Sequence, residues 1–168
     1  VKRLSQKGAL CRIFDISENE EDLGSTEFIR GDICNFRDIK KACSGIDVIY
    51  HNVAQVPLAK DILKFNQVNI EGTRNALEAA LDCGVKKFIY TSSSAIFGVP
   101  KKNPVDENDA PYPGEAYGLA KYKGELICKE FQDKGLDISI VRPRTIIGHG
   151  RLGIFQVLFE WISEGNNV

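Results

Sequence analysis

The sequence has little that would support several common functions. Its 168 residues carry 22 Lys and Arg against 23 Asp and Glu, a formal net charge of -1. There is therefore no surplus of positive charge to neutralise the phosphates of a nucleic acid or an acidic membrane surface. No apolar run approaches the roughly 20 residues that cross a bilayer, and the first residues lack the architecture of a secretory signal. We expect a small-molecule partner, no nucleic acid, no membrane and a cytoplasmic location.

Cysteine and histidine are too sparse to suggest disulfides or a metal site. The five cysteines are scattered without a Cys-x-x-Cys pair, and an odd count fits a reduced interior. The two histidines, His51 and His149, have no second ligand at metal spacing, so no metal is expected. The chain also lacks internal repeats, and 43% hydrophobic residues suffice for one domain with a real core.

Short apolar runs alternate with helical patterns, which is typical of βαβ units and a parallel sheet. Asn35 is expected to cap a short helix that ends before Gly45. Asn69 interrupts the apolar face of a longer helix, either as a half-exposed residue or as a buried amide that orients the site. The expected strands are 9–15, 27–30, 47–53, 85–91 and 138–142, the helices are 36–43 and 61–83, and a proline-rich loop spans 98–115. The pattern predicts an α/β fold with a doubly wound parallel sheet.

Tyr117 and Lys121 are the most informative pair in the chain. Four residues apart on a helix, they share one face, so the ammonium is expected to favour the phenolate and lower the pKa of Tyr117. Only Tyr117 among the five tyrosines has lysine at this spacing, and Ser92, Ser93 and Ser94 lie one connection upstream. The end of a strand is where open α/β sheets place ligands. We favour an acid/base pair over the alternative, a solvated helix face.

One acidic residue closes the first expected strand, and another follows the second. In a dinucleotide-binding sheet, a carboxylate at the position of Asp15 accepts hydrogen bonds from the adenosine ribose and repels a 2′-phosphate, which selects NAD over NADP. The alternative is that Asp15 only starts a turn. Asp32 and Ile33 follow the next strand, where a carboxylate and an apolar side chain are placed to flank the adenine.

Six motifs in order resemble one protein family almost from end to end. The chain resembles the extended short-chain dehydrogenases/reductases, the NAD-dependent epimerase/dehydratase superfamily, and particularly members of the UDP-glucose 4-epimerase type. The matching segments, after Asp15, are Gly31-Asp32-Ile33, His51-Asn52-Val53-Ala54, Asn69-Ile70-Glu71-Gly72-Thr73, 91–98 (TSSSAIFG), Tyr117-Gly118-Leu119-Ala120-Lys121 and Val141-Arg142-Pro143.

This resemblance implies a role for each matching residue. Tyr117 would be the general acid/base, with Ser93, or Ser94 if the register differs by one, as the catalytic hydroxyl. Lys121 would bind the nicotinamide ribose and lower the pKa of Tyr117. The cofactor, NAD, would lie along Asp15, Asp32, Ile33, Val53, Ala54, Gln55, Asn69, Tyr117, Lys121 and Pro143. The substrate would meet Ser93, Ser94, Thr145 and Arg151, and a homodimer through two long helices is a family-level expectation.

Departures from the family pattern narrow the chemistry. Sugar 4,6-dehydratases carry an Asp-Glu pair where this chain has Ser94 and Ala95, so dehydration is disfavoured. Epimerisation of a nucleotide sugar through a keto intermediate is the leading expectation. Thr145 replaces a common Asn, which weakens the sugar-nucleotide assignment and favours a hydroxysteroid- or flavonol-type dehydrogenase as the alternative. A third hypothesis is a non-catalytic NAD-sensing module, against which the intact Ser93 argues.

Two further features concern the ends of the sheet. The run Gly148–Gly153 matches Gly-x-Gly-x-x-Gly, but it does not follow its strand directly, so we expect a substrate-side loop with Arg151 available for an anionic group. Family members open with a strand and a glycine-rich turn, which nothing here resembles. We therefore expect 1–168 to be one partial NAD-binding Rossmann-type domain of a longer protein, lacking its central strand. The substrate-binding region would begin at about 145–168, and NAD binding by this portion alone would be poor.

Overall fold

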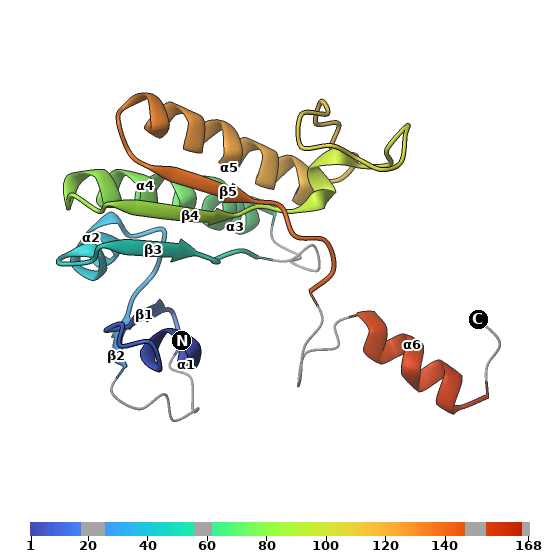
Figure 1. The fold of residues 1–168 in the computed structure, drawn as a ribbon, viewed down its shortest axis with the longest axis horizontal. Coiled ribbons are helices and arrows are strands. Elements are labelled where there is room, and N and C mark those ends of the chain that lie inside the picture. Colours follow the sequence, from blue (N-terminus) through green and yellow to red (C-terminus); the bar gives the residue numbers. More distant parts are fainter. Residues whose placement is uncertain (18–25, 56–61, 147–153, 166–168) are drawn as a thin grey trace.

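Five strands form two parallel sheets in the part of the chain that the structure describes, residues 1–17, 26–55, 62–146 and 154–165 (Figure 1). In this computed structural model, β1 (Arg12–Asp15) pairs with β2 (Glu27–Arg30). The second sheet has β4 (Lys87–Thr91) at its centre, between β3 (Val48–His51) and β5 (Ile138–Val141). The parallel α/β fold expected from the sequence is confirmed. The break between β1 and β3 falls where the expected strand order places the family's first strand.

The helices alternate with these strands. The described part contains α1 (Lys2–Ser5), α2 (Phe36–Cys43), α3 (Ile62–Asn66), a π-helical turn η1 (Gln67–Glu71), α4 (Gly72–Asp82), a 3₁₀ turn η2 (Ser94–Phe97), α5 (Ala116–Asp133) and α6 (Ile154–Ser163). The expected bounds of α2 are confirmed: the Asn35 side chain accepts a hydrogen bond from the Arg37 backbone, and Gly45 follows with a φ of 72°. Four of the five expected strands are longer in the prediction than in the structure.

The expected helix over 61–83 consists of α3, the π-helical turn η1 and α4. Asn69 lies within η1 and is only 2% exposed. The Thr73 hydroxyl donates to the Asn69 carbonyl at 2.8 Å. Single π turns inside helices are often found at functional sites. Of the two interpretations offered by the sequence, the buried amide is the one that the structure contains.

The hydrophobic core lies between β3–β5 and helices α2, α4 and α5, which pack side by side (Figure 1). Burial of Leu77, Phe88 and Cys128 is complete. Gly124 faces the ring of Tyr90, and a Cβ at this position would overlap the phenol oxygen. Glycine therefore lets α5 lie close to β4, which fixes the amino-terminal half of α5 over the end of that strand.

Residues 98–115 form the irregular connection that the prolines predicted. The segment contains no helix or strand, and Figure 1 shows it beyond the carboxyl end of β4, next to the start of α5. α6 lies apart from the sheets and the other helices (Figure 1). Among the described residues, no helix combines the length and apolar character needed to cross a membrane.

Candidate active site

Ser93 and Tyr117 meet beyond the carboxyl end of β4. Ser93 caps η2, where its Oγ accepts a hydrogen bond from the Ala95 N–H at 3.2 Å. Tyr117 lies in the first turn of α5. Burial raises the pKa of Tyr117, and a side-chain hydrogen bond with Ser93 acts in the opposite direction and lowers it. A bond of this kind lowers the pKa because it stabilises the phenolate. Ser93 and Tyr117, which the sequence analysis paired, therefore act on each other in the structure.

Lys121 lies one helical turn beyond Tyr117 on the same face of α5, as its spacing predicted. Its side chain is buried, at 3% exposure, and its Nζ donates to the Thr91 carbonyl at 2.8 Å. The ammonium lies 5.9 Å from the centre of the Tyr117 ring and 5.2 Å from that of Tyr90. Burial lowers the pKa of Lys121 to about 8.

The expected effect of Lys121 on Tyr117 differs from what the structure shows. The sequence suggested that the ammonium lowers the pKa of Tyr117, whereas that pKa is raised, chiefly by burial. The physical reason is the position of the Lys121 ammonium, which is bonded to the Thr91 carbonyl rather than to the phenol oxygen. The hydroxyl of Ser93 is the group that favours the Tyr117 phenolate here.

The ends of β4 and β5 are joined beside this pair. The Ser94 backbone N–H donates to the Pro143 carbonyl at 3.0 Å, which places Pro143 next to the serine segment. Of the two serines that the resemblance offered, Ser93 is the one whose side chain acts to lower the pKa of Tyr117. Thr145 is exposed further along the same segment. Arg151 and the run 148–153 lie outside the described residues.

The segment that follows β3 is held by Asn69. The amide oxygen of Asn69 accepts the Gln55 N–H at 2.9 Å, and its amide nitrogen donates to the Gln55 carbonyl at 3.2 Å. This pairing fixes the segment 53–55, including Val53 and Ala54, against η1. The Gln55 Oε1 atom is buried without a hydrogen-bond partner in the described part of the chain. A buried acceptor of this kind fits a ligand that carries amide or hydroxyl donors, as NAD does.

Asp15, the last residue of β1, and Asp32, after β2, each stabilise a turn. The Asp15 Oδ1 atom accepts a hydrogen bond from the Ser17 N–H at 3.1 Å, and the Asp32 Oδ1 atom accepts one from the Cys34 N–H at 2.9 Å. Asp15 is exposed at the end of its strand, where a ribose hydroxyl can still reach it. Ile33 is only 4% exposed and packs against Gly72. Most of the Ile33 side chain therefore belongs to the core rather than to a cofactor surface.

A buried ion pair beside the serines was not expected from the sequence. Glu125 on α5 is 1% exposed. Its Oε1 atom accepts hydrogen bonds from Ser92 Oγ at 2.6 Å and Arg142 Nε at 2.9 Å, and its Oε2 atom accepts one from Arg142 Nη2 at 2.8 Å. One signal was available: Glu125 follows Lys121 by four residues and Tyr117 by eight, so all three share a helix face.

His51, at the end of β3, is also buried beside the site. Its Nε2 atom lies 3.1 Å from the Thr73 Oγ1 atom. Because the Thr73 hydroxyl already donates to Asn69, the His51 Nε2 atom must carry the proton in this hydrogen bond. Burial, and then the charge of Lys121, lower the pKa of His51 to about 3. His51 is therefore a neutral structural donor, and the described residues contain no cluster of potential metal ligands.

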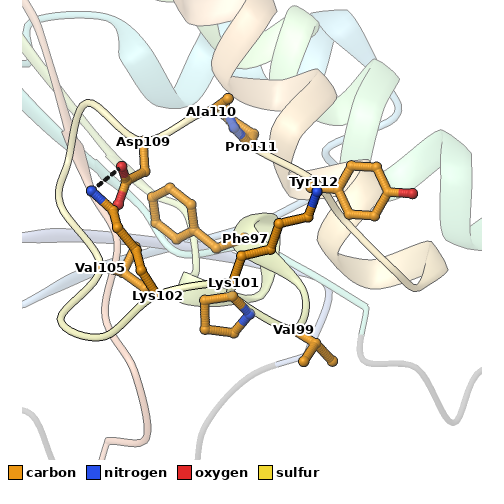
Figure 2. A pocket seen from close by; sticks show the side chains of 10 residues that line it. Phe97, Val99, Lys101, Lys102, Val105, Asp109, Ala110, Pro111 and Tyr112 are labelled. Atoms are coloured by element: carbon orange, nitrogen blue, oxygen red, sulfur yellow. Dashed lines mark ion pairs between the residues drawn. The ribbon is translucent and has the colours of Figure 1, made fainter.

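The proline-rich loop and Phe97 line an open pocket of about 390 Å³ (Figure 2). Its lining is largely apolar, with Phe97 at the centre of the view and Val99, Pro111 and Tyr112 around it. Lys102 turns to Asp109 in an ion pair of 2.7 Å, drawn dashed in Figure 2. The pocket lies on the connection that leads from Ser93 to Tyr117 along the chain.

The parallel strands and the residues at their carboxyl ends are typical of an α/β domain of the short-chain dehydrogenase/reductase class. Comparison with known proteins specifies the family. The model described as "NAD dependent epimerase/dehydratase family" matches residues 1–164, and the chain belongs to this family.

Individual relatives cover the chain almost completely. It is 47% identical over 168 residues to "Uncharacterized protein y4nG" of Sinorhizobium fredii, which aligns with 99% of this chain and 42% of that protein. It is 30% identical over 172 residues to the decarboxylating sterol-4-alpha-carboxylate 3-dehydrogenase of Mus musculus, with 98% of this chain and 47% of that protein covered. The chain thus spans less than half of the length of these relatives.

Among solved structures, the UDP-glucuronic acid 4-epimerase of Bacillus cereus in complex with NAD has a TM-score of 0.85 and 29% sequence identity. The match covers 98% of this chain and 59% of that one. The family, the Rossmann-type fold, the NAD-dependent enzyme class and the cofactor predicted from the sequence are confirmed at the level of the family.

Proposed function

We propose that this chain carries the proton-transfer site of an NAD-dependent epimerase that oxidises a secondary alcohol, most directly that of a nucleotide sugar, to a keto intermediate. The observation that carries this proposal is the position of Tyr117, whose ring centre lies 5.9 Å from the buried ammonium of Lys121 and whose pKa the Ser93 side chain lowers. Transfer of an alcohol proton needs a base and groups that orient it. Here the phenol and the amine come from α5, and the hydroxyl comes from the segment after β4.

In this proposal Tyr117 reacts as the phenolate and takes the proton of the substrate hydroxyl. The single O–H of Ser93, which favours that phenolate before substrate binds, then donates to the substrate oxygen. The Lys121 ammonium has three donors, of which one binds Thr91, so the others are available to ribose hydroxyls. Asp15, Gln55, Asn69 and Pro143 would hold the cofactor. NAD, when bound, accepts the hydride that leaves the carbinol carbon as its hydroxyl proton goes to Tyr117.

The fate of the keto intermediate separates the possible activities. Return of the hydride to the opposite face of the ketone gives epimerisation, while release of the ketone gives a dehydrogenase. Loss of water from the neighbouring carbon needs an additional acid and base, and Ser94 and Ala95 stand at the positions where the dehydratases carry them. The similarity to a UDP-glucuronic acid 4-epimerase supports the first outcome.

A hydroxysteroid-type dehydrogenase is the second candidate. Its support is the similarity to the mouse sterol-4-alpha-carboxylate 3-dehydrogenase together with the apolar lining of the loop pocket, where Phe97, Val99 and Tyr112 would suit a ring system. Thr145 and the exposed Ile146 also favour this candidate. Nucleotide-sugar enzymes commonly have Asn at the position of Thr145, and neither Thr145 nor Ile146 has the amide donor that Asn provides.

The test uses the full-length protein with NAD and a panel of UDP-sugars, dTDP-sugars and hydroxysteroids. An epimerase inverts one carbinol centre, detected by chromatography, with little net absorbance in the reduced nicotinamide band. A dehydrogenase accumulates reduced nicotinamide in proportion to ketone. The proposal would be overturned if the protein bound NAD but turned over neither the sugars nor the steroids, and if Tyr117→Phe bound NAD equally well. That result would favour a non-catalytic NAD-sensing module.

A further inference from the structure

The buried ion pair between Glu125 and Arg142 takes no part in the proton transfer proposed above. It is nevertheless bonded to Ser92, the neighbour of Ser93. Glu125 is on the helix that carries Tyr117 and Lys121, two turns further along. Ser92, which donates to Glu125 at 2.6 Å, is the residue directly before Ser93. The pair therefore joins α5, which carries Tyr117, to the end of β4, where the serine segment begins.

We propose that Glu125 and Arg142 are positioning residues, whose buried bidentate ion pair holds the Ser93 hydroxyl in register with the Tyr117 phenol. This inference rests on the proposed function of Tyr117. The geometry supports it at both ends: Ser92 N–H also donates to the Val141 carbonyl at 2.8 Å, so the residue before Ser93 is fixed by its backbone to β5 and by its side chain to α5.

Arg142 extends this control to the loop that follows Ser93. Its Nη1 atom donates to the Glu107 carbonyl at 2.8 Å, and its guanidinium lies 5.3 Å from the centre of the Phe97 ring. Phe97 belongs to η2 and lines the loop pocket. One guanidinium thus contacts α5, the loop and η2.

Stability alone is a weak reason for this arrangement. Taking two charges out of water is costly, and buried ion pairs are often replaced by apolar side chains without loss of stability. A bidentate pair with an additional serine hydrogen bond instead gives a fixed geometry, because both carboxylate oxygens and two guanidinium nitrogens must be satisfied at once. Such a geometry is what two reacting hydroxyls need, since displacement by about 1 Å can reduce a rate about 100-fold.

The same helix provides a matched control. Glu130, five residues beyond Glu125, pairs with Arg74 of α4 at 2.9 Å, and both side chains are largely exposed. This pair also joins α5 to a neighbouring helix, but neither of its side chains bonds to the serine segment 92–94. Glu130→Ala removes one carboxylate from α5 without touching the serine segment.

The experiment compares Glu125→Ala, Ser92→Ala and Glu130→Ala in the full-length protein. The pKa of Tyr117 is read by NMR from tyrosine labelled with carbon-13 at Cζ, its signal assigned by its loss in Tyr117→Phe. Loss of the Ser93 hydrogen bond raises this pKa, because that bond lowers it, whereas loss of a nearby negative charge alone would lower it. The sign therefore separates positioning from a simple charge effect. Ser92→Ala changes no charge and keeps the ion pair, so it decides the matter if Glu125→Ala does not fold.

We expect Glu125→Ala to raise the pKa of Tyr117 and to reduce kcat about 10- to 100-fold with little change in the Kd for NAD. Ser92→Ala should act in the same direction to a smaller extent, and Glu130→Ala should change neither quantity. An unchanged or lowered pKa with kcat equal to that of Glu130→Ala would overturn the positioning role alone. Full turnover in Tyr117→Phe would instead overturn the proposed function, so the two failures are distinguishable.

Discussion

Gly118 lies against the main-chain carbonyl of Ala95, so closely that a Cβ at position 118 would overlap the Ala95 oxygen. Gly118 is the residue after Tyr117, and Ala95 donates its own N–H to Ser93. The absence of a side chain at one position thus brings the first turn of α5 onto η2. The position of Tyr117 relative to Ser93, which caps η2, depends on this approach.

Gly118→Ala should therefore separate the two hydroxyls while leaving their chemistry intact. We expect kcat to fall about 10- to 100-fold and the free energy of unfolding in urea to fall by about 1–3 kcal/mol, the usual cost of forcing an extra methyl group into a packed site. Gly114→Ala is the matched control, because nothing lies within 4 Å of a Cβ at that position. Equal kinetics in the two variants would show that the contact has no effect on the site.

His51 should make the fold sensitive to acid. Its pKa is about 3 in the folded protein and 6.5 ordinarily, so between these values the unfolded chain binds one more proton and stability falls as the pH falls. At about pH 4.5 this group should cost about 2–3 kcal/mol relative to neutral pH. The loss is measured by urea unfolding at both pH values.

The control for this prediction is His51→Gln, which cannot titrate. Its overall stability is expected to be lower at every pH, since the contacts of the imidazole with Phe88 and Tyr90 are lost. Its loss of stability between neutral and acid pH should be smaller than that of the native protein by the amount given above. Identical losses in the two proteins would mean that His51 is protonated in the folded state.

Asn69→Ala should weaken cofactor binding through the backbone of Gln55. The substitution removes both hydrogen bonds that hold Gln55, which should reduce stability by about 1–3 kcal/mol and raise the Kd for NAD about tenfold, or roughly 1.4 kcal/mol. Calorimetry measures the Kd. Asn66→Ala, at an exposed position at the end of α3, should change neither. Reduced stability with an unchanged Kd would separate the 53–55 segment from the cofactor.

Asp15→Asn tests the cofactor preference. Asparagine keeps an oxygen for the Ser17 N–H but removes the charge that repels a 2′-phosphate. The preference for NAD over NADP in kcat/KM should narrow about tenfold, or roughly 1.4 kcal/mol. Asp47→Asn removes an exposed carboxylate directly before β3 and should leave the preference for NAD over NADP unaltered. If both variants behave alike, the role of Asp15 is limited to its turn.

Local signals explain what the sequence predicted well. Asn35 and Gly45 flank α2 in sequence and act on it directly, so both ends of that helix were predicted correctly. The spacing of Tyr117 and Lys121 placed them on one face because helix geometry requires it. Strand lengths were less predictable, because a strand begins where its partner begins to pair. The β1–β2 ladder starts with Arg12 opposite Glu27, whereas the expected strand began at position 9.

Contacts between distant elements explain what was missed. The sequence gives no sign that Arg142 would reach Glu125, which belongs to a different element, or that the Lys121 ammonium would bond to the Thr91 carbonyl. The second contact is why the pKa of Tyr117 is not lowered as the spacing suggested. α6 was not predicted as a helix, although its residues were assigned to the expected start of the substrate region.

The most direct test of the account is a single-turnover measurement of hydride transfer in Tyr117→Phe, monitored by the absorbance of reduced nicotinamide with NAD prebound. Loss of general acid/base catalysis should slow the step about 10²- to 10⁴-fold while the Kd for NAD stays close to that of the native protein, because the phenylalanine ring fills the same space. Hydride transfer at the native rate in this variant would show that Tyr117 is not the residue that takes the substrate proton.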